Sequence, residues 1–180
     1  MWCALHWLRP RISVSRPPTE EEVSLLYHDI GKGVWHLQYV EYALNTLIAL
    51  RVDIREPGRV THEAAQAALA KHRGGVLGNS VKTARDNSLL PIELEQELSA
   101  FIAERNWLIH RSIDSHGELL YTEAGRTETF ARLEKFISDA KALQHGIAEQ
   151  IEQFAESQGV SARTTEAAAH AKIAKLRGEP

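Results

Sequence analysis

The chain has 180 residues, of which 43% are hydrophobic and 25% are charged, and its formal net charge is −3. These values suit a single globular domain. They exclude a strongly basic nucleic-acid-binding protein, so any RNA contact needs a local patch. Cys3 is the only cysteine, which excludes an internal disulfide and a zinc site made of cysteines. The nine histidines show no ligand spacing, and we expect neither a metal nor another cofactor.

Residues 1–18 are expected to form a flexible N-terminal arm. The apolar stretch of this arm is short, is broken by His6 and is followed by arginines, so it does not resemble a signal peptide. No apolar segment has the length of a membrane span. We therefore expect no association with a membrane and a cytoplasmic location, with which a single cysteine is compatible.

Residues 19–159 are expected to form one helical domain. Thr19, followed three residues later by Glu22, forms a capping box, and the helix that it starts should run to about Asp53. Two glycines either kink this helix or let another helix approach closely: Gly31 and Gly33. Three aromatic residues follow at helical spacing, and we expect them in the core or at a dimer interface rather than as a base-stacking platform: Trp35, Tyr39 and Tyr42.

Three further helices follow a turn at Pro57. A short one starts at Thr61, and another has Pro91 in its first turn and frays near Ser112. The last carries apolar residues at steps of three and four, broken only by a glutamine: Phe130, Leu133, Ile137, Ala140, Gln144, Ile147, Ile151 and Phe154. Such a stripe predicts packing against other helices.

Residues 160–180 are rich in alanine but have few large apolar side chains, so we expect a loosely attached helix or tail. Taken together, the patterns predict an all-α fold, namely an up-and-down bundle of four main helices plus short helices.

The segment "ERNWLIH" carries the most distinctive chemistry. On a helix, Asn106 and His110 lie one turn apart and Arg105 is next to Asn106, so we expect the three to share one side. Arginine binds phosphate, asparagine can orient a neighbouring group, and histidine transfers protons near neutral pH. Together they can promote attack of an RNA 2′-hydroxyl on the adjacent phosphate without a metal. The alternative is structural, with Arg105 paired to a carboxylate and His110 a hydrogen-bonded, half-buried histidine.

Basic residues elsewhere are candidates for holding RNA despite the negative net charge. Arg111 follows the motif directly, and Arg51 and Arg55 cluster near the end of the first helix. An ordinary solvated surface is the alternative for all three.

The motif "RNWLIH" resembles the Arg-polar-x3-His signature of the HEPN superfamily of α-helical proteins, and the resemblance covers roughly Thr19 to Gly159. It implies a HEPN-like bundle that acts as a metal-independent endoribonuclease, often the toxin of a toxin–antitoxin or antiviral defence module. Two protomers would then bring two motifs together in a homodimer, with Arg105 and His110 catalytic and Asn106 supporting.

The resemblance has one departure. A toxin branch of the superfamily continues His-x-Tyr, and a partner nucleotidyltransferase modifies that tyrosine, but Ser112 stands at this position here. An antitoxin or nucleotidyltransferase-like partner is still implied, although its mechanism is left open. Many members are not catalytic, so the alternatives are a non-catalytic HEPN-like interaction or nucleotide-binding module, or a plain helical scaffold that dimerises through its long apolar stripe.

Overall fold

The computed structural model describes residues 15–56 and 59–178. Helices follow one another along this part of the chain: α1 (Glu20–Ile48), the π-helical turn η1 (Ala49–Ile54), α2 (His62–His72), α3 (Leu77–Asp86), α4 (Ile92–Asn106), the π-helical turn η2 (Trp107–Arg111), α5 (Ser112–His116), the 3₁₀ turn η3 (Leu119–Tyr121), α6 (Glu123–Ser157) and α7 (Ala162–Arg177). The only β-type pairing among these residues is an isolated bridge between Ser15 and Thr122. The all-α fold predicted from the sequence is therefore confirmed.

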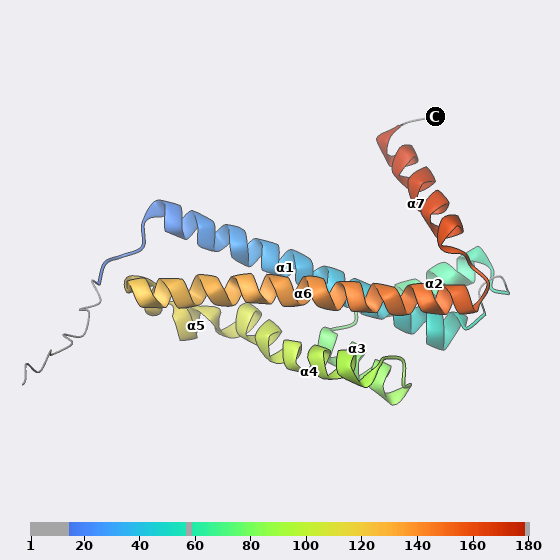
Figure 1. Ribbon diagram of the computed structural model, residues 1–180, viewed down its shortest axis with the longest axis horizontal. Coiled ribbons are helices and arrows are strands. Elements are labelled where there is room, and N and C mark those ends of the chain that lie inside the picture. The colour runs from blue at the N-terminus through green and yellow to red at the C-terminus, as the bar shows by residue number, and fades with distance from the viewer. Residues whose placement is uncertain (1–14, 57–58, 179–180) are drawn as a thin grey trace, which may run out of the picture.

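Three long helices form the body of the bundle. α1 and α6 lie side by side and run in the same direction, whereas α4 returns against both (Figure 1). Contacts show the parallel register of α1 and α6, because Glu22 pairs with Arg126 and Gly33 lies against Phe136. The short helices α2 and α3 connect the end of α1 to the start of α4 (Figure 1).

Local sequence signals explain where the helices begin and end. Thr19 and Glu22 form the predicted capping box at the start of α1, which satisfies backbone N–H groups that have no partner inside the helix. Thr122 caps α6 in the same way, by accepting a hydrogen bond from the N–H of Gly125. Beyond α6, Gly159 has a φ of +79°, the left-handed conformation with which glycine commonly ends a helix.

The core lies where α1, α4 and α6 meet. Phe101 of α4 stacks on Phe136 of α6 with ring centroids 4.6 Å apart. Leu143, next to the polar Gln144 of the predicted stripe, is buried and supplies the core side chain there. The stripe on α6 thus packs inside the chain, so its central residues are not available to a dimer. The largest fully buried side chains come from all the packed helices: Phe136, Leu44, Leu47, Ile48, Leu77, Leu98, Leu133, Ile147 and Val40.

Polar contacts fix α3 to α1. The Asn45 side chain donates from Nδ2 to the carbonyl of Gly75 at 3.3 Å and accepts at Oδ1 from the Ser80 hydroxyl at 2.6 Å. Asn45 and Ser80 are buried, so each needs the other as a hydrogen-bond partner. Glu41 accepts at 3.3 Å from the N–H of Leu77, at the start of α3. No separate helix was expected between the one that starts at Thr61 and the one with Pro91 in its first turn, but α3 is such a helix and these bonds hold it.

Two expectations change with the structure. The aromatic residues of α1 are not in the core, because Trp35 is 60%, Tyr39 42% and Tyr42 58% exposed. Of the expected arm, residues 1–14 lie outside the described part of the chain, as does the tip of the predicted turn at 57–58. The last residues of the arm are held in place, because the N–H of Arg16 donates to the carbonyl of Tyr121 at 2.9 Å.

Candidate functional site in a π-helical turn

The motif lies where α4 changes from α-helical to π-helical hydrogen bonding. Arg105 and Asn106 are the last residues of α4, and His110 lies inside η2. In a regular α-helix, residues five apart point about 140° away from each other. A π-helical turn pairs residue i with i+5 instead, so the start of η2, which lies between Arg105 and His110, narrows the angle between their side chains. The regular helix expected from the sequence does not by itself bring these two residues together.

The three motif residues are in direct contact. Arg105 Nη1 lies 3.2 Å from His110 Nε2 and 3.3 Å from Asn106 Oδ1. Arg105 is half-buried, whereas Asn106 and His110 are exposed. Arg105 Nε is covered by protein and has no acceptor among the described residues. The head of Arg105 thus lies between two exposed polar side chains, while its stem is packed into the bundle.

Donor and acceptor chemistry defines the protonation of this arrangement. A guanidinium only donates hydrogen bonds, so His110 Nε2 accepts from Arg105 Nη1 and carries no proton of its own. An Nε2 atom that accepts has a lone pair with which it can take a proton, which is what a general base requires. A permanent cation next to it can stabilise negative charge as it develops on a phosphate.

Two exposed isoleucines border His110. Ile109 is 40% and Ile113 is 83% exposed, and they lie on either side of His110 in the sequence. Apolar side chains grouped around polar ones are typical of surfaces that bind another molecule. Ile113 was not among the residues expected at the site.

The residues expected to hold RNA lie in different places. Arg111 is exposed in η2, directly after His110. Arg51 Nη1 donates to the carbonyl of Leu89 at 2.6 Å, and Arg55 Nε donates to the carbonyl of Val52 at 2.8 Å. Leu89 precedes α4, and Arg105 is near its other end, about 20 Å away at about 1.5 Å per residue. The structure thus brings Arg111 to the motif, but not Arg51 or Arg55.

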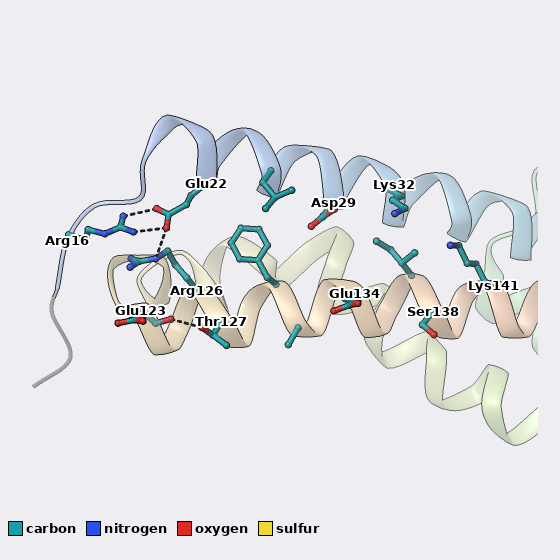
Figure 2. Close-up of a pocket in the computed structure, with 14 residues that line it drawn as sticks. Arg16, Glu22, Asp29, Lys32, Glu123, Arg126, Thr127, Glu134, Ser138 and Lys141 are labelled. Carbon is teal, nitrogen blue, oxygen red and sulfur yellow. Dashed lines mark hydrogen bonds and ion pairs between the residues drawn. The ribbon is translucent and has the colours of Figure 1, made fainter. Parts of the chain in front are cut away.

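A large groove lies away from the motif. It lies between α1 and α6, has a volume of about 1030 Å³ and is lined by apolar side chains such as Phe130 with charged residues along its edges (Figure 2). At one end, Glu22 binds Arg16 at 2.7 Å and Arg126 at 3.2 Å. Arg126 is 6% exposed, so this cluster closes the end of the groove and ties the chain before α1 to the start of α6.

A second set of polar residues, which was not expected from the sequence, forms hydrogen bonds to Trp107 inside the motif. Trp107 Nε1 lies 3.0 Å from Ser115 Oγ and 3.2 Å from His116 Nδ1. The signal available in the sequence was a Ser–His pair directly after the motif, where the helix was expected to fray. Its contact with Trp107 depends on the path of the chain and could not be derived from spacing.

Comparison with models of protein families, with curated proteins and with solved structures finds no match to this chain. Among the described residues, no three histidine, cysteine, aspartate or glutamate side chains are grouped so as to hold a metal ion. None of the helices in the same part of the chain is both long and apolar enough to cross a membrane.

Proposed function

We propose that this protein is a metal-independent endoribonuclease of the HEPN type. Arg105 and His110 would be its catalytic residues and Asn106 a supporting one. The observation that carries the proposal is the 3.2 Å contact between Arg105 Nη1 and His110 Nε2 on an exposed π-helical turn. π-Helical turns are rare and are frequently found at functional sites. The resemblance of "RNWLIH" to the HEPN signature supplies the reaction class.

In this reaction His110 Nε2 takes the proton of an RNA 2′-hydroxyl, whose oxygen attacks the adjacent phosphate. Arg105 leaves His110 Nε2 to bind the phosphate and stabilises the charge of the transition state. Asn106, which accepts from Arg105 Nη1 at 3.3 Å, keeps the guanidinium close to the imidazole. A second proton transfer, to the leaving 5′-oxygen, would use the motif of a second protomer.

The proposal includes a homodimer formed through the motif surface. The exposed side chains of Ile109 and Ile113 support it, because burying them against a partner would be favourable. Arg111 would contact the RNA substrate next to this interface. A cytoplasmic toxin or defence component fits the activity, with an antitoxin or nucleotidyltransferase-like protein as its partner.

The decisive experiment is RNA cleavage by the purified protein in the presence of a chelator. We expect His110→Ala to lower the rate by about 10²–10⁴-fold, the usual contribution of a general acid or base. Arg105→Ala should lower it by about 10²–10³-fold, as when an oxyanion donor is lost. The matched controls are His145→Ala and Arg59→Ala, whose side chains are exposed and remote from the motif in sequence; both should cleave like wild type.

Two outcomes would remove the proposal: unchanged cleavage in both motif variants, or cleavage that the chelator abolishes. Ile113→Glu tests the dimer separately, because it places a charge on an exposed position without disturbing the core. We expect a monomer by sedimentation, with cleavage lost but the melting temperature kept.

One observation favours the alternative of a non-catalytic HEPN-like interaction or nucleotide-binding module. Arg105 is half-buried and its Nε is covered, as in an arginine that holds helices together. In that case Arg105→Ala and His110→Ala would both lower the melting temperature, and wild-type protein would not cut RNA.

A further inference from the structure

The two ends of η2 are tied to the same pair of residues. Trp107, the first residue of η2, donates from Nε1 to Ser115 Oγ at 3.0 Å, with His116 Nδ1 as a second acceptor at 3.2 Å. The carbonyl of Arg111, the last residue of η2, lies 2.7 Å from Ser115 Oγ. Ser115 Oγ and His116 Nδ1 are themselves 2.7 Å apart. Ser115 and His116 therefore span the π-helical turn from beginning to end.

Packing holds Trp107 in reach of this pair. Trp107 is 5% and His116 is 6% exposed, and their rings meet edge to face with centroids 5.1 Å apart. Arg132 of α6 lies over the Trp107 ring, with Cζ 4.0 Å from the centroid. Glu104 of α4 holds Arg132 through bonds of 2.9 and 3.0 Å. The indole has one N–H group, and among residues 15–56 and 59–178 its polar partners are Ser115 and His116.

The neutral form of His116 fits this surrounding, and the charged form does not. An indole N–H only donates, so Nδ1 must be free of a proton to accept from Trp107. Nε2 is buried and has no partner in the described part of the chain. Nε2 carries a proton in both forms, so the difference lies at Nδ1: a charged imidazole would place a second N–H there, against the Trp107 N–H and with Ser115 Oγ as its neighbour.

The charged groups around His116 act in both directions. Burial lowers the pKa of the His116 imidazole, and Arg132 lowers it further. Glu128 of α6 and Glu104 of α4 raise it, but by less. His116 is therefore neutral at physiological pH.

We propose that His116, together with Ser115, is the positioning residue of the Arg105–His110 pair. Neutral His116 holds Trp107, and with it the start of η2, so that the turn keeps the π-helical register that brings Arg105 to His110. Loss of the acceptor lets the turn relax toward α-helical register, in which residues five apart diverge by about 140°. The effect of His116 on catalysis rests on the proposed function, whereas its effect on the register of η2 does not.

Protonation has the same effect as removing the acceptor. The folded-state pKa of His116 lies below the ordinary 6.5, so the unfolded chain binds more protons just below pH 6.5 and stability falls there. The hydrogen bond by which His116 Nδ1 positions η2 is fully formed above pH 6.5. It is lost as the pH falls through the lowered pKa of His116.

The test compares two variants of His116: one keeps an acceptor for the Trp107 N–H that does not titrate, and the other removes the acceptor. In His116→Asn, the Asn Oδ1 atom takes the place of Nδ1, whereas His116→Leu removes the acceptor with a similar volume. The probe is the Trp107 indole N–H resonance in protein labelled with ¹⁵N-tryptophan, assigned with Trp107→Phe and followed from pH 8 to pH 5. His145→Asn, on an exposed histidine of α6, is the control for loss of a histidine.

We expect the wild-type indole resonance to move as the pH falls below 6.5, with His145→Asn behaving identically. It should stay fixed in His116→Asn and be displaced at every pH in His116→Leu. In cleavage assays, His116→Leu should lower kcat by about 10²-fold, the scale of a misplaced catalytic group, with KM little changed. His116→Asn should restore kcat and make the loss of kcat toward acid pH less steep.

An indole resonance that is the same in wild type and His116→Leu, or that does not respond to pH in wild type, overturns the inference. These readouts do not depend on activity. If wild-type protein cuts no RNA but the resonance behaves as expected, the proposed function fails and the positioning of η2 stands. If RNA is cut equally by wild type and by a folded His116→Leu, the positioning role fails while the proposed function stands.

Discussion

Gly33 of α1 lies directly against Leu108 of η2. A Cβ atom at position 33 would be 3.2 Å from Leu108 Cδ2 and 3.4 Å from Phe136 Cδ1. A Cβ at Gly31, on the same helix, would meet nothing within 4 Å. Gly33 therefore lets the π-helical turn and α6 approach α1, which is one of the two roles considered for these glycines, whereas Gly31 has no such neighbour.

Valine substitutions at the two glycines should separate these roles. Gly33→Val adds two methyl groups where even a Cβ is crowded, and we expect it to lower the free energy of unfolding by about 1–3 kcal/mol through overpacking. Gly31→Val should change it by less than about 0.5 kcal/mol, because the added atoms face open space. Urea unfolding at constant m-value measures both. Equal stabilities of the two variants would show that α1 and η2 are not in close contact.

Glu22 should make the protein sensitive to acid. The guanidinium of Arg16, the N–H of Thr19 and, more weakly, Arg126 hold the pKa of the Glu22 carboxyl at about 2, below its ordinary 4.5. A lowered folded-state pKa means that the ionised carboxyl stabilises the fold fully above pH 4.5, and that this stabilisation is lost as the pH falls toward 2. Glu22→Gln should therefore melt at a lower temperature than wild type at pH 7.

The gap in melting temperature should close as both proteins are moved from pH 4.5 to pH 2. Glu21→Gln, one residue away in the same exposed first turn, is the control and should melt like wild type at pH 7. A gap between wild type and Glu22→Gln that is constant from pH 7 to pH 2 would contradict the role assigned to the Glu22 charge.

Of the arginines expected to hold RNA, Arg51 should affect the stability of the fold and Arg111 the affinity for RNA. Arg51→Ala removes the bond to the carbonyl of Leu89, so we expect a loss of about 1–3 kcal/mol in the free energy of unfolding, because a charged hydrogen bond is lost. Its RNA affinity, once corrected for folded protein, should not change. Arg111→Ala should leave the melting temperature unchanged and weaken RNA binding, with a smaller salt dependence of the binding constant. Fluorescence anisotropy with a single-stranded RNA at several salt concentrations gives both affinities, and the reverse result would return Arg51 to the RNA-binding surface.

Removal of α7 should leave the bundle intact. α7 points away from the other helices (Figure 1), and Ile173 and Leu176 are 45% and 78% exposed. A chain that ends at Val160 should therefore lose helical circular dichroism in proportion to the removed residues. Its free energy of unfolding should change by less than about 0.5 kcal/mol. A melting temperature lowered by several degrees would show that α7 packs on the bundle in solution.

Much of the fold could be predicted because its signals are local. The capping box of Thr19 and Glu22, the cap at Thr61 and the apolar stripe around Leu133 depend on residues within one or two turns of each other. The core was the wrong place for the aromatic residues of α1, because burial depends on which face of the helix meets the rest of the bundle. Trp35 lies outside that face, and no spacing rule distinguishes an exposed aromatic residue from a buried one. The dimer interface, which was the other place expected for them, stays a prediction.

The candidate site also has a part that local sequence determines and a part that depends on contacts between distant segments. The sequence alone determined that the chain is all-α and that Arg105, Asn106 and His110 fall close together at the end of a helix, because helix formation and short spacing are local properties. Only the tertiary structure decided that Arg105 reaches His110. That contact needs a π-helical turn, and the turn is held by Trp107, Ser115 and His116 and seated against Gly33. These are packing and hydrogen-bond contacts between segments, which arise only when the chain has folded.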